Sequence, residues 1–171
     1  MAIGLACALT TLAAAADKFP EPTGIGKATF GMAVAEVKEL FPNMRPTKAT
    51  EAALKKGGEQ TLAEFDLDDQ SVGPLKCKCR LRFFKERFYQ ASFNCPDRDP
   101  VVEYLNKTYG PPTQSTATSI YWMGEHGMVG LAPRSAGFSL EDVKIGKEVQ
   151  MTLVTAVFGQ TPVITPVAPT P

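Results

Sequence analysis

The chain has 171 residues, 44% of them hydrophobic, and its 18 basic residues balance its 18 acidic ones. This length and apolar share suit one compact domain with a substantial core. Because zero net charge gives no long-range attraction to a polyanion, we do not expect a nucleic-acid partner.

Residues 1–16 carry no charged side chain, include an apolar run and end in Ala14-x-Ala16 before Asp17. This pattern is typical of a secretory signal peptide with its cleavage site, and a buried first helix is the alternative. A membrane-spanning helix needs about 20 apolar residues, so we expect no spanning segment and leave peripheral membrane association open. The sequence thus predicts a periplasmic or secreted protein in a compartment where disulfides form.

After an entry segment at residues 17–29, apolar side chains recur at helical spacing from Val34 to Phe41, and Pro42 follows. This spacing predicts a short amphipathic helix. Residues 43–59 are polar and contain Gly57-Gly58. We therefore expect a turn or loop there.

Residues 75–95 alternate between apolar and polar side chains, which predicts a β-hairpin with one buried and one solvated face. A three-residue loop at 85–87 would pair residues whose numbers sum to 172, so that Cys77 lies opposite Cys95. Directly opposed Cβ atoms are about 4.5–5.5 Å apart, close enough for a bridge. We predict a Cys77–Cys95 disulfide in an oxidising compartment and a buried thiol at Cys79, although a two-residue shift would pair Cys79 with Cys95.

These three cysteines could also form a metal site. A fourth ligand is not evident in the sequence, and thiolates in an oxidising compartment tend to form disulfides. We expect no metal and no other cofactor.

The basic side chains of the hairpin face an acidic series in residues 60–68. A loop through residues 69–75 would place Asp68 opposite Lys76 and, in the same register, Glu64 opposite Arg80. Such cross-strand pairs contribute roughly 0.2–1 kcal/mol each. The basic stripe is therefore predicted to be a solvated sheet face and not a track for phosphates.

A second helix is predicted at residues 100–109, where Asp99 serves as N-cap, Pro100 fits the first helical position and Gly110 ends the helix. Strands are predicted at residues 119–123, 128–132, 136–140 and 147–158, separated by Gly-containing turns. The Pro/Thr-rich residues 159–171 predict an extended, disordered tail.

The two halves of the chain share a pattern, because a shift of 68 positions superimposes Val34 on Val102 and Phe41 on Tyr109. We therefore predict a duplicated α-β-β-β unit, with repeats at about 30–96 and 97–158 in a single domain. The predicted fold class is α+β: one antiparallel sheet with two short helices packed on one face.

Two segments resemble a known family. Residues 30–42 (FGMAVAEVKELFP) and residues 105–112 (LNKTYGPP), which precede a tryptophan-bearing strand, are similar to the exported SmpA/OmlA (BamE-like) proteins. The β-lactamase-inhibitor protein shares the doubled helix-plus-sheet plan. The resemblance covers residues 30–158 and implies a small envelope protein that binds other proteins and is not an enzyme.

The residues that could be reactive form no catalytic motif. The only histidine, His126, lies between two glycines in Gly124-Glu125-His126-Gly127, and no nucleophile motif accompanies it. The adjacent Tyr121 and Trp122 read most simply as core, but one of them could be exposed and anchor a partner, because large aromatic residues are enriched at binding hot spots.

Together these features predict a non-catalytic exported binding or assembly protein of the bacterial envelope, with another protein as its partner. One alternative is a proteinaceous inhibitor of an exported hydrolase. A further alternative is a hydrolase that uses His126.

Overall fold

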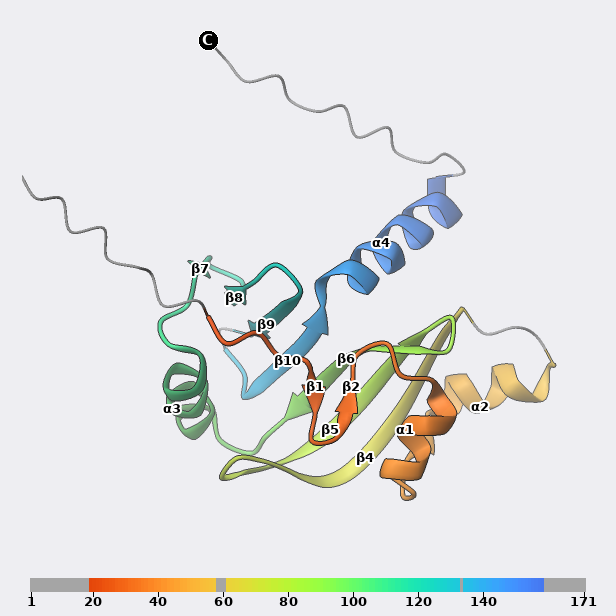
Figure 1. The fold of residues 1–171 in the computed structure, drawn as a ribbon, viewed down its shortest axis with the longest axis horizontal. Coiled ribbons are helices and arrows are strands. Elements are labelled where there is room, and N and C mark those ends of the chain that lie inside the picture. The colour runs from red at the N-terminus through yellow and green to blue at the C-terminus, as the bar shows by residue number, and fades with distance from the viewer. Residues whose placement is uncertain (1–18, 58–60, 133, 159–171) are drawn as a thin grey trace, which may run out of the picture.

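The computed structural model describes residues 19–57, 61–132 and 134–158, and the predicted signal peptide and Pro-rich tail lie outside this part of the chain. The described residues form an α+β fold, as predicted: an eight-stranded antiparallel sheet, a separate two-stranded ribbon and four helices (Figure 1). The strand order in the large sheet is β3-β4-β5-β6-β10-β9-β8-β7.

The strands are β1 (Gly24–Ile25), β2 (Ala28–Thr29), β3 (Arg45–Pro46), β4 (Leu62–Val72), β5 (Leu75–Phe84), β6 (Arg87–Asn94), β7 (Gln114–Ser115), β8 (Ile120–Met123), β9 (Gly127–Leu131) and β10 (Gly137–Asp142). The helices are α1 (Val34–Leu40), α2 (Lys48–Lys55), α3 (Arg98–Tyr109) and α4 (Val143–Phe158).

Two meanders meet at the centre of the sheet. Strands β4, β5 and β6 pair in chain order, as do β8, β9 and β10, and the pairing of β6 with β10 joins the two sets. A short helix, α1 or α3, precedes each meander, and the first half of the chain also contains β3 and α2.

The predicted hairpin is present, and its register is the expected one over most of its length, with Cys79 paired with Phe93 and Arg82 with Gln90. The predicted three-residue loop is wrong. The turn consists of Lys85 and Glu86, both at positive φ (47° and 63°), a combination typical of two-residue hairpin turns. A bulge at Tyr89 compensates, because Phe83 pairs with Phe88, and Tyr89 therefore faces the opposite side from Phe88.

The predicted register between the acidic and basic strands is also wrong, by two residues. Asp66 lies opposite Arg80 and not Lys78, and Glu64 lies opposite Arg82. The reason is that β4 continues to Val72 and turns tightly into β5, while a bulge after Leu67 takes up the difference in length.

The helices differ from the prediction at three places. Helix α2 replaces the expected loop, and its N-cap Thr47 accepts a hydrogen bond from the Thr50 backbone N–H at 3.3 Å. Helix α3 begins two residues earlier than predicted, so that Asp97 and not Asp99 is the N-cap, and Gly110 at φ 76° ends it as expected. Residues 147–158, predicted as a strand, belong to α4.

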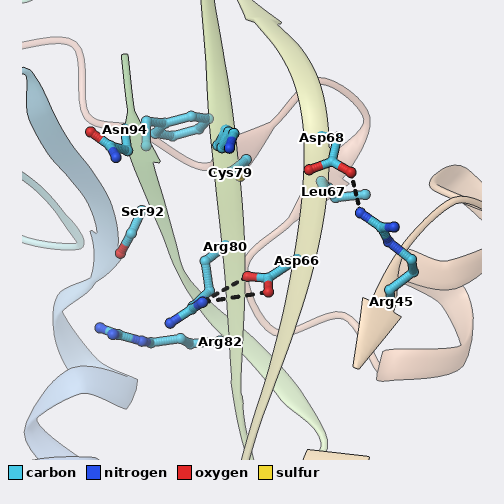
Figure 2. A pocket seen from close by; sticks show the side chains of 11 residues that line it. Arg45, Asp66, Leu67, Asp68, Cys79, Arg80, Arg82, Ser92 and Asn94 are labelled. Atoms are coloured by element: carbon cyan, nitrogen blue, oxygen red, sulfur yellow. Dashed lines mark hydrogen bonds and ion pairs between the residues drawn. The ribbon is translucent and has the colours of Figure 1, made fainter. Parts of the chain in front are cut away.

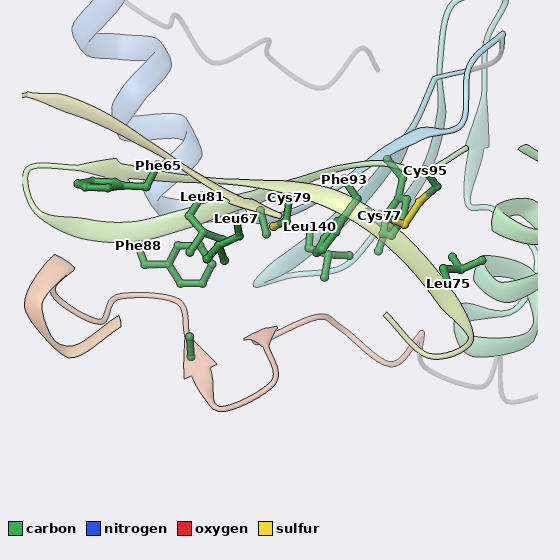
Figure 3. Close-up of a cluster of buried hydrophobic side chains, with 14 of the residues drawn as sticks. Phe65, Leu67, Leu75, Cys77, Cys79, Leu81, Phe88, Phe93, Cys95 and Leu140 are labelled. Atoms are coloured by element: carbon green, nitrogen blue, oxygen red, sulfur yellow. A yellow bond between two sulfur atoms is a disulfide. The ribbon is translucent and has the colours of Figure 1, made fainter. Parts of the chain in front are cut away.

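One face of the sheet carries the main core. Side chains of α1, α3 and the β1–β2 ribbon are buried against it, and Figure 1 shows the ribbon between these two helices. The predicted Cys77–Cys95 disulfide is present in this layer, and Cys79 is a free, buried cysteine (Figure 3). Burial raises the pKa of the Cys79 thiol to about 12.

Helix α4 packs on the other face of the sheet, where no helix was predicted. Its Ile145 and Val149 form a small buried cluster with Phe84 and Tyr89. The Asp142 carboxylate accepts a hydrogen bond from the Ile145 N–H at 2.7 Å and so caps the first turn. Figure 1 shows the rest of α4 projecting away from the sheet.

Candidate functional site

The sheet face opposite the main core, here called the open face, has α4 at one end. One row of directly paired residues crosses all eight strands of this sheet, and we call it the central row. Its members are Arg45, Asp66, Arg80, Ser92, Ser139, Gly130, Tyr121 and Gln114. The neighbouring rows on either side belong to the core, because successive side chains of a strand point to opposite faces.

The β3–β5 end of the open face carries paired charges (Figure 2). Arg80 Nε donates to Asp66 Oδ1 at 2.7 Å, and this hydrogen bond raises the pKa of Arg80. Arg45 pairs with Asp68 in the same region. Because such half-exposed pairs contribute about 0–1 kcal/mol each, their main effect is to fix the direction of the side chains.

A hydrogen-bonded chain runs beside the central row toward α4. Arg82 donates to Glu64 at 2.8 Å and to Gln90 at 2.5 Å, and the Gln90 amide donates to Glu141 at 2.5 Å. Burial raises the pKa of Glu141. A Cβ atom at Gly146 would lie 2.1 Å from Glu141 Oε1, so a larger residue there would displace the Glu141 carboxylate from its present position.

Two hollows adjoin along the central row. The first, of about 470 Å³, lies at the charged end, and the second, of about 330 Å³, extends toward β8; both are lined by Ser92 and Phe93. Ser139 and Gly130 form part of the second hollow. These small residues leave an open trough across the sheet, which we call the cross-sheet trough.

Tyr121 lines the β8 end of the cross-sheet trough. A Cβ atom at Gly130 would lie 3.5 Å from the Tyr121 ring and 3.2 Å from Ser139 Oγ. The glycine therefore allows the ring to lie close to the floor of the trough. The predicted site residue Tyr121 is half-buried and stays a candidate contact for a partner.

Trp122 cannot fill the role of an exposed anchor. It is 1% exposed, and its indole Nε1 donates to the Gly110 carbonyl at 2.8 Å, which ties β8 to the end of α3. Trp122 is buried because the side-chain alternation of β8 directs it into the core and Tyr121 to the open face. The expectation of one exposed aromatic anchor therefore falls on Tyr121, and partner binding at β8 stays a prediction.

His126 lies in the turn between β8 and β9, away from the trough lining. Its side chain is 82% exposed, and its ring Nε2 is 3.9 Å from Glu125 Oε1. The backbone N–H groups of Glu125, His126 and Gly127 all donate to the Glu21 carboxylate, at 2.5–3.0 Å. These bonds lower the pKa of Glu21, and the turn thereby holds the N-terminal segment.

Sequence reasoning missed the floor of the trough. Ser92, Ser139 and Gly130 come from three strands, and only the pairing of β6 with β10 brings them together. Alternation alone indicates that Ser92 and Ser139 point away from the core. It does not indicate that they are neighbours.

In the part of the chain that the structure describes, no cluster of three or more His, Cys, Asp or Glu side chains could hold a metal ion. None of the described helices has both the length and the apolar character needed to cross a membrane.

No protein-family model, curated protein or solved structure matches the chain. The resemblance to BamE-like proteins therefore rests on the two sequence motifs alone.

Proposed function

We propose that this chain is a non-catalytic exported protein of the bacterial cell envelope that binds another protein through the open face of its sheet. The observation that carries this proposal is the cross-sheet trough, which joins a hollow of about 470 Å³ to one of about 330 Å³. Small side chains on its floor leave room for the side chains of a partner. Charged groups at one end and Tyr121 at the other offer the polar and aromatic contacts that are common in interfaces.

Export is supported by two independent features. Residues 1–16 have the pattern of a signal peptide, and the Cys77–Cys95 disulfide is a bond that persists mainly in oxidising compartments.

The surroundings of the three side chains that could be reactive, Cys79, His126 and Glu141, favour a binding role over catalysis. The Cys79 thiol is buried, and its pKa of about 12 keeps it protonated, whereas a nucleophilic cysteine needs a lowered pKa. His126 belongs to an exposed turn, and Glu141 is hydrogen-bonded to Gln90 below α4. None of these three groups lies beside a second reactive group among the described residues in the arrangement that a nucleophile and its base need.

The alternative function, inhibition of an exported hydrolase, would use the same face. The two proposals differ only in the identity of the partner. Inhibition of that partner by the purified chain distinguishes them.

The proposal is tested by filling the trough. Ser139→Trp places a large side chain on its floor, whereas the matched control Ser71→Trp adds the same side chain at an exposed position of β4, opposite Lys76. The tagged full chain and both variants are expressed in the source cells, and the co-purifying proteins are compared by mass spectrometry. We expect a partner that is retained by the wild type and by Ser71→Trp and is lost with Ser139→Trp. Identical sets of proteins for all three would contradict the proposal.

A further inference from the structure

We propose that the charged end of the open face binds an acidic segment of the protein partner, with a carboxylate placed between Lys78 and Arg80. This inference rests on the proposed function and names the chemistry of the contact at one end of the trough. It goes beyond the general binding role because it assigns the sign of the partner's charge.

The hollow at this end has more positive than negative charge. Its lining contains four cationic side chains (Arg45, Lys78, Arg80 and Arg82) and two anionic ones (Asp66 and Asp68). Glu64 pairs with both Arg80 and Arg82, so the local excess is one positive charge. A protein with no net charge thus concentrates cationic groups in one hollow, where they attract an anionic ligand.

Lys78 is the cation in this hollow that lacks an acidic partner. It lies between Cys77 and Cys79, which are buried on the core side, so its side chain faces the open side. Among the described residues no carboxylate oxygen lies within 4.0 Å of its ammonium group.

The bulge in β4 explains this missing partner. The pairing of β4 with β5 jumps from Leu67–Cys79 to Gln70–Cys77, so no residue of β4 is paired with Lys78. The acidic residue at the bulge, Asp68, pairs with Arg45 of β3 instead. A register without the bulge would have given Lys78 an acidic neighbour.

Uncharged hydrogen-bonding groups complete the site. Asn94 is the direct cross-strand partner of Lys78, and Ser92 is that of Arg80. Both line the hollow, and Figure 2 shows them on the strand beside that of Arg80, on the other side from Asp66 and Asp68. A carboxylate accepts several hydrogen bonds through its two oxygens, and bonds from charged donors are the strongest of these.

The arrangement favours an acidic peptide over a phosphate polymer. Asp66 and Asp68 alternate with the cations, so the hollow offers separate positive positions and not the continuous positive track that follows a phosphate backbone. The adjoining hollow is lined by serine, glycine, alanine and apolar side chains, with no charged one. A segment that has one or two carboxylates followed by uncharged residues matches both hollows.

The experiment uses the full chain labelled with ¹⁵N and three probes: hexaglutamate, hexalysine and a six-nucleotide thymidine oligomer. Amide shifts are followed during each titration at low salt, where charge interactions are least screened. We expect hexaglutamate to shift the amides of Lys78 and Asn94, and hexalysine to leave them unchanged.

Lys78→Glu and the neutral Lys78→Gln should each weaken hexaglutamate binding, the charge reversal by about tenfold or more, the size expected for one charged hydrogen bond. The matched control is Lys76→Glu, on the same strand and face but opposite Ser71 and outside the hollow. It should weaken binding less than Lys78→Glu does, because the Lys76 charge acts on the ligand only from a distance and forms no direct hydrogen bond in the hollow. Unperturbed spectra away from β5 confirm that the variants fold.

Three results would overturn the inference: no shift with hexaglutamate, equal losses for the two glutamate variants, or tighter binding of the thymidine oligomer at the same amides. The proposed function can fail separately. If Ser139→Trp loses a partner while hexaglutamate binding does not depend on Lys78, the open face binds protein but the carboxylate site is wrong. If the titration succeeds and no partner depends on Ser139, the carboxylate site stands without the protein-binding role.

Discussion

Glu21 links the N-terminal segment to the β8–β9 turn through three backbone N–H donors. Because these donors favour the ionised carboxylate, its pKa in the folded protein lies below the ordinary value of 4.5. The stabilisation is therefore fully present above pH 4.5 and is lost as the pH falls through the folded-state pKa.

Glu21→Gln should lower the melting temperature at pH 7, because the amide cannot provide two anionic acceptors. At pH 3, below the ordinary pKa of 4.5, the difference from the wild type should become smaller, because the unfolded wild-type chain is then mostly protonated at Glu21 and the stabilisation falls with pH. Thermal unfolding of both proteins at the two pH values measures this, and the other carboxylates cancel in the comparison. A difference that is independent of pH would show that the ionised form of Glu21 is not what holds the turn.

Adjacent aromatic residues of β8 should have opposite effects on stability and binding. Trp122→Phe removes the hydrogen bond to the Gly110 carbonyl and leaves space in the core, which should cost about 2–3 kcal/mol of unfolding free energy. Tyr121→Ala should change stability much less but weaken binding of the partner. Urea unfolding and affinity measurements on both variants test this, and a binding defect with Trp122→Phe alone would reverse the assignment.

Helix α4 is attached to the sheet through its first two turns. Ile145 and Val149 pack on Phe84 and Tyr89, and Glu148 accepts from Arg87 at 2.5 Å. The ion pair lowers the pKa of Glu148. The second half of the helix makes no comparable contact among the described residues, and Leu153 is 48% exposed.

Ile145→Ala should therefore detach α4, with a loss of about 2 kcal/mol, the lower end for a buried aliphatic residue, because the cluster is small. Leu153→Ala is the control on the same helix and should cost less than about 0.5 kcal/mol. Hydrogen exchange of the α4 amides reports the detachment while the β5 and β6 amides stay protected. Equal exchange in the two variants would contradict this account of the attachment.

The sequence pattern was enough to predict strands that pair with their immediate neighbour in the chain, such as β5 and β6. The alternation in residues 75–95 was sufficient for the hairpin and for most of its buried face. It left Cys77 and Cys79 as alternative partners of Cys95, and the Cys77–Cys95 bond followed from the register of the assumed loop, which the bulge in β6 restores. The same reasoning failed at α4, since Val149, Met151 and Leu153 fit a strand as well as a helix. Residues 147–158 are helical because the start of α4 packs on Tyr89. Tyr89 faces α4 only because of the bulge in β6.

The candidate site could be predicted only in part. The charged end was foreseen as neighbouring acidic and basic strands, but its register depends on the bulge after Leu67. The floor of the trough depends on the pairing of β6 with β10, whose residues are more than 40 positions apart. The duplication of the helix-and-meander unit stays a prediction.

One face of the sheet contributes the stability of the fold, and the other is proposed to bind the partner. The core face is covered by α1, α3 and the ribbon and contains the disulfide, whereas most of the trough lining lies on the other face. Changes in the core should therefore affect stability without altering the partner, and changes in the trough the reverse.

The disulfide joins residues 18 positions apart, and a closed loop of this size contributes about 3 kcal/mol by restricting the unfolded chain. The double variant Cys77→Ala/Cys95→Ala should lose about this amount in urea unfolding. Reduction with dithiothreitol is the control: it should lower the stability of the wild type similarly and leave the double variant unchanged. A double variant as stable as the oxidised wild type would contradict this contribution.

We expect the partner to contact the open face and not the helix-covered face of the sheet. This expectation is tested most directly by photo-crosslinking of the full chain in its source cells, with p-benzoylphenylalanine in place of Tyr121 in the trough or of Tyr104 on α3, two half-buried tyrosines. We expect a discrete adduct with one protein from position 121 and none from position 104. An adduct from position 104 alone, or the same adducts from both positions, would contradict it.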